Sequence, residues 1–280
     1  MKPLKLNFIA FGILLLGCNQ KTDNRNTVVK EQPSTDTVKD QPKEIAKNEH
    51  LKDHEIVAIN NVVALFRAKD IDKISRIIRF PLNREYPIPP IQNAKELTQR
   101  FSEIFDQILI DKIANSKIEQ WSQVGWRGIM LDRGDLWMAN SDGIITTVNY
   151  QSDFEKELRR DLIAREKANL HPSLKSFESP THKIKTKNYL IRIDELAGNK
   201  YRYASWKKGE KETSKPDLIL SNGELAFEGS GGNYVITFVQ GQYTYKIYRN
   251  VLGEKNSPEI TLYIEKEGKV ILTEDGALIL

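Results

Sequence analysis

Apolar residues recur at helical spacing from about residue 51 to about residue 116. In the first stretch they repeat every three or four positions, which would place them on one face of an amphipathic helix: Ile56, Ile59, Val63 and Phe66. Two further helices are expected after Asp70 and Asn93, because each of these side chains can accept a hydrogen bond from a helix N-terminus. The apolar spacing predicts that the helix after Asn93 continues to Ile108.

The spacing then changes from helical to alternating. The runs 128–131, 136–139 and 144–150 are separated by short segments rich in Asp, Asn and Gly, which favour tight turns. Three consecutive antiparallel strands are therefore expected. Helices followed by an antiparallel sheet is an α+β order, and we assign it to one domain, residues 51–150.

A charged helix is expected after this domain. Ser152 and Glu155 form a capping-box pattern at its start, and it extends to about Asn169. Pro172 and Pro180 then predict a loop, in which His182 and nearby serines show no nucleophile motif. Residues 151–185 are therefore interpreted as a linker helix and loop.

The remainder, residues 186–280, has the pattern of an all-β domain. Short β-prone runs recur about every ten residues: 189–193, 201–203, 218–220, 225–227, 234–239, 243–248, 260–264 and 270–272. Tight turns are expected at Asn222-Gly223, Gly241 and Glu267-Gly268, because these residues tolerate the backbone that hairpins require. The pattern predicts a small barrel or sandwich.

The N-terminal 50 residues have two different compositions. Lys2 and Lys5 precede an apolar run, Phe8 to Leu16, which is shorter than the roughly 20 residues that span a bilayer as a helix. Residues 1–17 are therefore expected to be an export signal. Residues 18–50 contain no aromatic side chain and are mostly polar, so they are expected to form a flexible tether.

Charge and composition exclude some classes of protein. The chain has 42 Lys and Arg against 38 Asp and Glu, a net charge of +4, and both signs are interleaved along its length. A nucleic-acid-binding protein would concentrate basic residues on one stripe, so no nucleic-acid partner is expected. With one cysteine, Cys18, the chain cannot form an internal disulfide. No metal-ligand or cofactor motif is found, so no metal site and no cofactor are predicted.

The segment Leu15-Leu16-Gly17-Cys18 resembles the lipobox of bacterial lipoproteins. The resemblance implies cleavage before Cys18, acylation of that cysteine and attachment to a membrane of the cell envelope. Asn19 is not the aspartate that signals inner-membrane retention in some Gram-negative bacteria, so the outer membrane is favoured. The periplasmic and surface-facing sides both remain open. The alternative is an ordinary exported thiol beside a plain signal peptide.

Residues 51–150 also resemble the cone-shaped nuclear transport factor 2-like superfold. The resemblance rests on the early helix pair, the Arg79-Phe80-Pro81-Leu82 break and the Trp126-Arg127-Gly128 entry into the sheet. It implies a pocket at the open end of the cone, which some members use for catalysis and others for binding or dimerisation. Enzymes of this fold, such as ketosteroid isomerases, place acidic groups in that pocket.

Candidate binding residues follow from these interpretations. Trp126, Trp137 and Tyr150 could line a cone pocket, although strand aromatics are also ordinary core residues. Trp206, Lys207 and Lys208 form a basic segment beside an aromatic residue, which could recognise an acidic partner, although a solvated loop has the same composition. No residue is assigned a catalytic role. If the cone were catalytic, its available carboxylates would be Asp106, Asp111, Asp132 and Asp135.

The sequence therefore predicts a lipid-anchored envelope protein. We expect it to act as a non-catalytic binding module for an envelope protein, a glycan or a small ligand. Two alternatives remain at this point: an enzyme, either a hydrolase or an isomerase, that uses the cone pocket, and a structural protein of envelope assembly.

Overall fold

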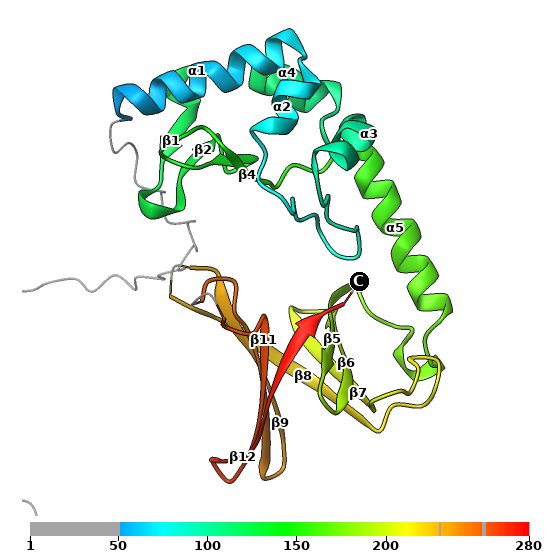
Figure 1. Ribbon diagram of the computed structural model, residues 1–280. Coiled ribbons are helices and arrows are strands. Elements are labelled where there is room, and N and C mark those ends of the chain that lie inside the picture. The colour runs from blue at the N-terminus through cyan, green and yellow to red at the C-terminus, as the bar shows by residue number, and fades with distance from the viewer. Residues whose placement is uncertain (1–50, 230, 254–255, 280) are drawn as a thin grey trace, which may run out of the picture. The chain divides into compact units, whose positions relative to one another are not determined.

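The computed structural model describes residues 51–229, 231–253 and 256–279. The segments predicted to be a signal peptide (1–17) and a tether (18–50), together with the predicted lipid-attachment residue Cys18, lie outside the described residues. Helices come first along the described chain and strands dominate after them, as Figure 1 shows by its colour sequence from blue to red. Within the described part, no helix combines the length and the apolar character needed to cross a membrane.

The first region is helical, as the apolar spacing predicts. Its helices are α1 (Asp53–Ala68), α2 (Ile71–Arg76), α3 (Ala94–Ile104) and α4 (Gln107–Ala114). Both expected caps are present: Asp70 Oδ1 accepts from the Lys73 amide at 3.1 Å, and Asn93 Oδ1 accepts from the Glu96 amide at 3.0 Å. Each cap satisfies one of the amides that a helix start leaves without an intrahelical partner.

The prediction of one helix from Asn93 to Ile108 is wrong, because the chain breaks between α3 and α4. Asp106 Oδ1 accepts from the Leu109 amide at 2.9 Å and so starts a new helix. Ile108 is exposed rather than part of the buried stripe. The apolar spacing ran through this break, and only the cap at Asp106 marked it.

A four-stranded antiparallel sheet follows, in the order β1-β2-β3-β4. Its strands are β1 (Trp121–Gln123), β2 (Ile129–Leu131), β3 (Leu136–Met138) and β4 (Ile145–Val148), with short 3-10 turns at Ile118–Gln120 and Gly125–Arg127. The last three strands confirm the prediction. The sequence missed β1, which is three residues long and has only one fully buried side chain. Helices and sheet share one apolar core, which includes Phe66, Phe105 and Met138.

Helix α5 (Asp153–Ala168) starts at a buried ion pair. Ser152 Oγ caps it by accepting from the Glu155 amide at 3.1 Å. The Glu155 carboxylate, however, pairs with Arg84, whose Nε lies 2.6 Å from Oε1, and both side chains are buried. Arg84 also donates to the carbonyl oxygens of Val148 and Tyr150. The pair therefore fixes the start of α5 to the end of β4.

The remaining strands form a closed antiparallel barrel, which decides between the predicted barrel and sandwich. Each strand pairs with the next, and the last pairs with the first. The strands are β5 (Ser179–Thr186), β6 (Tyr189–Leu196), β7 (Lys200–Lys207), β8 (Leu218–Glu228), β9 (Asn233–Gln240), β10 (Tyr243–Arg249), β11 (Ile260–Lys266) and β12 (Lys269–Leu278). Alternate side chains fill the interior, among them Ile191, Ile236 and Ile247.

A second, smaller apolar cluster lies on the outward side of β7. A 3-10 turn at Pro172–Leu174 and the residues after it cover this side. The cluster contains Leu170, Leu174, Phe177, Ala204 and Trp206, all buried. Part of the barrel's outer face is therefore core and not surface.

Two details of the all-β prediction need correction. The barrel begins at Ser179, earlier than the predicted boundary at residue 186, because Pro180 lies in the first strand next to a register shift instead of in a loop. The runs 218–220 and 225–227 belong to one strand, β8, and the register against β7 shifts between Leu220 and Gly223. Asn222-Gly223 therefore lies in a bulged strand where a turn was expected. The turns at Gly241 and Glu267-Gly268 are confirmed, with positive φ at each residue.

Candidate binding site at the barrel mouth

A cavity of about 650 Å³ opens at one end of the barrel. This end, which we call the barrel mouth, is where β5, β7, β9 and β11 begin and where β6, β8, β10 and β12 end. The barrel residues that matter most for its chemistry are His182, Glu195, Tyr201, Tyr234, Arg249 and Glu259. The segment 81–90 and Arg159 of α5 contribute further lining.

Strand alternation places polar residues in this cavity. On β9, Phe238 and Ile236 are buried inside the barrel, and Tyr234 is the next inward position toward the mouth. On β10, Arg249 follows buried Ile247 in the same way. The interior is therefore apolar along its length and becomes polar where these strands reach the mouth.

His182 and Tyr234 form a hydrogen-bonded pair across the mouth. His182 Nε2 and the Tyr234 hydroxyl are bonded, and the two rings are nearly parallel with centroids 5.9 Å apart. Burial, with a contribution from the positive charge of Arg249, lowers the pKa of His182 to about 4, so the ring is neutral at pH 7. Burial raises the pKa of Tyr234 to about 12, so its hydroxyl stays protonated. The pair is therefore uncharged.

Arg249 places a positive charge beside this pair. Its Nη1 donates to the carbonyl oxygens of Asn250 and Glu259 at 3.1 and 3.0 Å. Within the described ranges it forms no ion pair. The other cations that line the cavity do have carboxylate partners: Arg159 pairs with Glu85, Lys183 with Glu212, and Arg84 with Glu155. The carbonyl bonds hold the Arg249 guanidinium in place without neutralising it.

Two carboxylates also line the cavity. Glu259 is exposed, and its Oε2 accepts from the Leu278 amide at 3.0 Å. Glu195 is half-buried on β6, opposite Tyr201 in the strand register. Among the charged groups of the cavity, Arg249 is the one whose charge lowers the pKa of both His182 and Tyr234.

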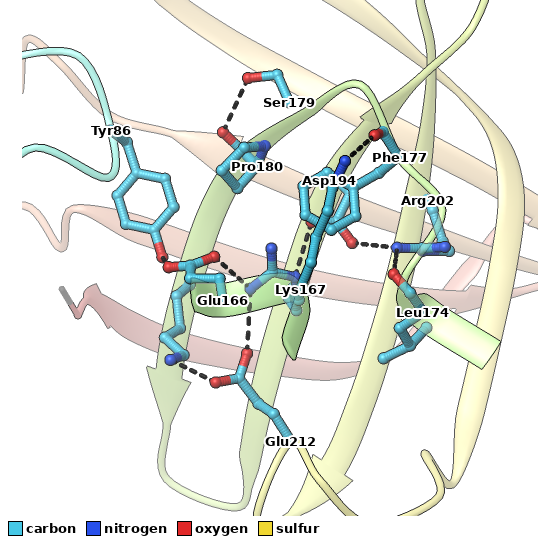
Figure 2. Close-up of polar contacts among 12 residues, drawn as sticks. Tyr86, Glu166, Lys167, Leu174, Phe177, Ser179, Pro180, Asp194, Arg202 and Glu212 are labelled. Atoms are coloured by element: carbon cyan, nitrogen blue, oxygen red, sulfur yellow. Dashed lines mark hydrogen bonds and ion pairs between the residues drawn. The ribbon is translucent and has the colours of Figure 1, made fainter. Parts of the chain in front are cut away.

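A second polar cluster lies on the outward side of β6 and is fully paired in charge (Figure 2). Arg192, 1% exposed, binds Asp194 at 2.7 Å and Glu166 of α5 at 2.8 Å. Asp194 also accepts from Arg202 at 2.6 Å, and the Tyr86 hydroxyl donates to Glu166 at 2.8 Å. These contacts join α5 and the segment 81–90 to the barrel wall. Because these buried charges are paired with one another, we interpret the cluster as structural and not as a ligand site.

The three aromatic candidates of the first region do not line the barrel-mouth cavity. Trp126 is exposed. Trp137 is half-buried, with the Arg127 guanidinium 5.7 Å from its ring centroid. The Tyr150 hydroxyl donates to Asp106 Oδ2 at 2.8 Å. Their use in binding stays a prediction.

Trp206 is fully buried and is therefore not accessible as an anchor for a partner. Its Nε1 donates to the Ser214 carbonyl at 3.0 Å, and it packs in the outer apolar cluster. The strand pattern alone gave no sign that this outward position is covered. Lys207 and Lys208 are exposed, and a binding role for these two lysines stays a prediction.

The carboxylates considered for a catalytic cone make ordinary structural contacts. Asp106 caps α4, and Asp111 accepts from Gln107 at 2.7 Å. Asp132 and Asp135 both pair with Lys112. Among the residues that the structure describes, no three potential metal ligands come together.

The sequence interpretation missed the residues that line the barrel mouth. His182 was assigned to a loop because Pro180 precedes it, yet it lies on β5. The alternation Tyr234-Ile236-Phe238 was a usable signal, since it places the tyrosine on the core-facing side of its strand. Arg249 follows Ile247 in the same alternation, but only barrel closure places it next to His182.

Comparisons with known proteins give no relative for this chain. No protein-family model matches it. Searches of curated proteins and of solved structures give no significant match either. Function is therefore inferred from the residues of this chain and from their geometry.

Proposed function

We propose that this chain is a lipid-anchored protein of the cell envelope that binds a small ligand at the barrel mouth without catalysis. The observation that carries the proposal is the cavity of about 650 Å³ that contains Arg249 beside the His182–Tyr234 pair. Concave sites with a few converging polar groups on an apolar wall are typical ligand sites. Apolar side chains fill the barrel interior behind these groups.

The chemistry of the site favours binding over catalysis. A general acid or base works best when its pKa lies near the working pH. The pKa of His182 is about 4 and that of Tyr234 about 12, so neither exchanges a proton readily at pH 7. As a neutral donor and acceptor, the pair is suited to orienting a ligand by hydrogen bonds.

The location in the envelope is proposed from the lipobox-like segment at Cys18. The polar residues 18–50 would separate the acylated end from the start of the first helix by an average span of about 30 Å for a random coil. The outer membrane is the favoured site, with the periplasmic or surface-facing side left open. A tether of this length leaves the barrel mouth accessible to ligands near the membrane.

The binding test uses the chain from residue 19 onward, purified as a soluble protein. A panel of sugars, short carboxylates, phosphates, peptides and amphiphiles is screened by thermal shift, and hits are measured by calorimetry. We expect at least one class to bind, and Tyr234→Phe to weaken it about tenfold through loss of one hydroxyl contact. Tyr263→Phe is the matched control, because Tyr263 does not line the barrel-mouth cavity. Failure of the whole panel, or equal affinity in both variants, would overturn the proposal.

A further inference from the structure

Three exposed apolar side chains lie beside the polar barrel mouth, on the side formed by β8, β9 and β10. Phe227, near the end of β8, is 72% exposed, and Val251 and Leu252, directly after β10, are 50% and 46% exposed. We call these three residues the apolar rim. Large apolar side chains left exposed together at the entrance of a cavity mark a contact surface more often than scattered ones do.

The apolar rim is continuous with the cavity. Phe227 is the register partner of Tyr234, and their rings meet edge to face with centroids 5.9 Å apart. Val251 follows Arg249 by two residues. The apolar rim therefore lies directly next to Tyr234 and Arg249 of the cavity.

Asn233 connects the two parts of the apolar rim. Its Oδ1 accepts from the amides of Val251 and Leu252, both at 2.8 Å. Its Nδ2 donates to the Leu252 carbonyl at 2.9 Å. The start of β9 and the segment after β10 are thus held together, which fixes two rim residues relative to the cavity.

We propose that the ligand is a single-chain anionic amphiphile, whose carboxylate or phosphate head binds Arg249 and Tyr234 and whose apolar chain lies on Phe227, Val251 and Leu252. This inference rests on the proposed function and names its ligand class. Arg249 is the cation of the cavity that has no carboxylate partner among the described residues, so it complements an anionic head. A ligand without an apolar chain would leave the rim exposed.

Two other occupants account for only part of the site. A short anion or a sugar would use Arg249 and Tyr234 but not the apolar rim. An anionic membrane surface would contact the rim, but a bilayer headgroup layer would not need a cavity of about 650 Å³. The amphiphile is the ligand that uses the charge, the hydroxyl and the exposed apolar area together.

The test measures binding of dodecanoate below its micelle concentration to the chain from residue 19 onward, by calorimetry. Butyrate has the same head without the chain, and dodecyltrimethylammonium has the same chain with a cationic head. We expect dodecanoate to bind at least tenfold more tightly than either. Equal binding of the cationic amphiphile, or binding only to anionic phospholipid vesicles, would overturn the inference.

Variants locate the bound amphiphile. Arg249→Gln is expected to weaken dodecanoate binding about tenfold, while Arg249→Lys, which keeps the charge, recovers part of the loss. Phe227→Ser is expected to weaken it several-fold. Val239→Ser is the matched control, because Val239 is 70% exposed near the opposite end of the barrel. Unchanged affinity in Arg249→Gln and Phe227→Ser would also contradict the inference.

The same panel separates this inference from the proposed function. If butyrate or a sugar binds in a Tyr234-dependent way and dodecanoate does not, the ligand class is wrong and the binding function stands. If no compound binds, both fail. The circular dichroism spectrum and urea unfolding of each variant show whether its fold is retained.

Discussion

In this protein, the protonation state and burial of a side chain depend more on the groups around it than on its residue type. His182 is neutral because it is desolvated and lies near Arg249, and Arg84 is buried because Glu155 and two carbonyl groups satisfy it. The capping residues Asp70, Asn93 and Ser152 need only their local amides, and the sequence predicted all three correctly. The local cap at Asp106 was missed, and none of the distant partners of His182 and Arg84 was predicted.

Titration of His182 is expected to make the protein less stable in acid. Its folded-state pKa of about 4 lies below the ordinary value of 6.5, so the unfolded chain binds the proton more tightly. Stability is therefore lost as the pH falls from about 6.5 to about 4. For a half-buried ring we expect a contribution of about 1–2 kcal/mol.

Urea unfolding at pH 7 and at pH 4 measures this effect. The difference between the two free energies of unfolding should be smaller in His182→Gln than in the parent chain. Tyr248→Phe, a control that keeps His182, should leave the difference unchanged. Identical pH dependence in the parent and His182→Gln would contradict the assignment.

The buried pair of Arg84 and Glu155 is expected to be sensitive to removal of one partner. Arg84→Met leaves a buried carboxylate without its cation and should lower the free energy of unfolding by about 3–5 kcal/mol. Changing both residues, Arg84→Met with Glu155→Leu, should recover most of this loss, because no uncompensated charge remains.

An exposed ion pair on the same helix provides the control. Arg160 and Glu157 of α5 are both largely exposed, so Arg160→Met should change stability by less than about 1 kcal/mol. Equal losses in Arg84→Met and Arg160→Met, measured by urea unfolding, would show that the buried pair contributes little.

At the scale of elements, the sequence predicted whether a segment is a helix or a strand better than it predicted where each element begins and ends. The alternating runs gave strands, but the fusion of 218–220 and 225–227 into β8 depended on how β7 and β8 pair. Asn222-Gly223 has the composition of a hairpin turn, and it lies in a bulged strand because the strand continues on both sides. The break between α3 and α4 likewise depended on one cap at Asp106.

Close packing next to the bulge of β8 requires glycine at position 223. A Cβ there would clash with the ring of Phe238, which is buried inside the barrel. Gly223→Ala should therefore lower the free energy of unfolding by about 1–3 kcal/mol through overpacking. Phe238→Leu removes part of the ring that the new Cβ would contact. The double variant should therefore lose less free energy of unfolding than the sum of the two single variants.

Gly241 is the control for this change. It has φ +59, and a Cβ added there would meet no atom within 4 Å, so Gly241→Ala carries only the backbone penalty of about 1 kcal/mol. If Gly223→Ala is no more destabilising than Gly241→Ala in thermal unfolding, the close approach of β8 to Phe238 is not important for stability.

At the scale of the whole molecule, the strands form one site only after the barrel closes. Ser179–Thr186 and Lys269–Leu278 are far apart in the sequence, and their pairing completes the ring. Closure brings His182 of β5, Tyr234 of β9 and Arg249 of β10 to the same end. The outward side of β6 and β7 is covered in turn, which explains why Trp206 is core.

Membrane attachment is the prediction that concerns the whole chain. Expressed with its native leader in a bacterial host, the chain should be cleaved before Cys18, gain acyl mass and pellet with membranes. Cys18→Ser should stay soluble without acyl mass, because the thiol that carries the lipid is absent. Intact mass spectrometry and membrane fractionation measure both properties. Equal behaviour of the two forms would exclude lipidation at Cys18.

By itself the sequence determined the order of elements: helices, a small antiparallel sheet, a capped charged helix and a run of β-strands. Those features follow from periodicity and capping, which act over a few residues. Only the tertiary structure decided that the strands close into a barrel, that Trp206 is covered, and that His182, Tyr234 and Arg249 share one cavity. The physical reason is that strand pairing and burial depend on contacts between segments that local patterns do not encode.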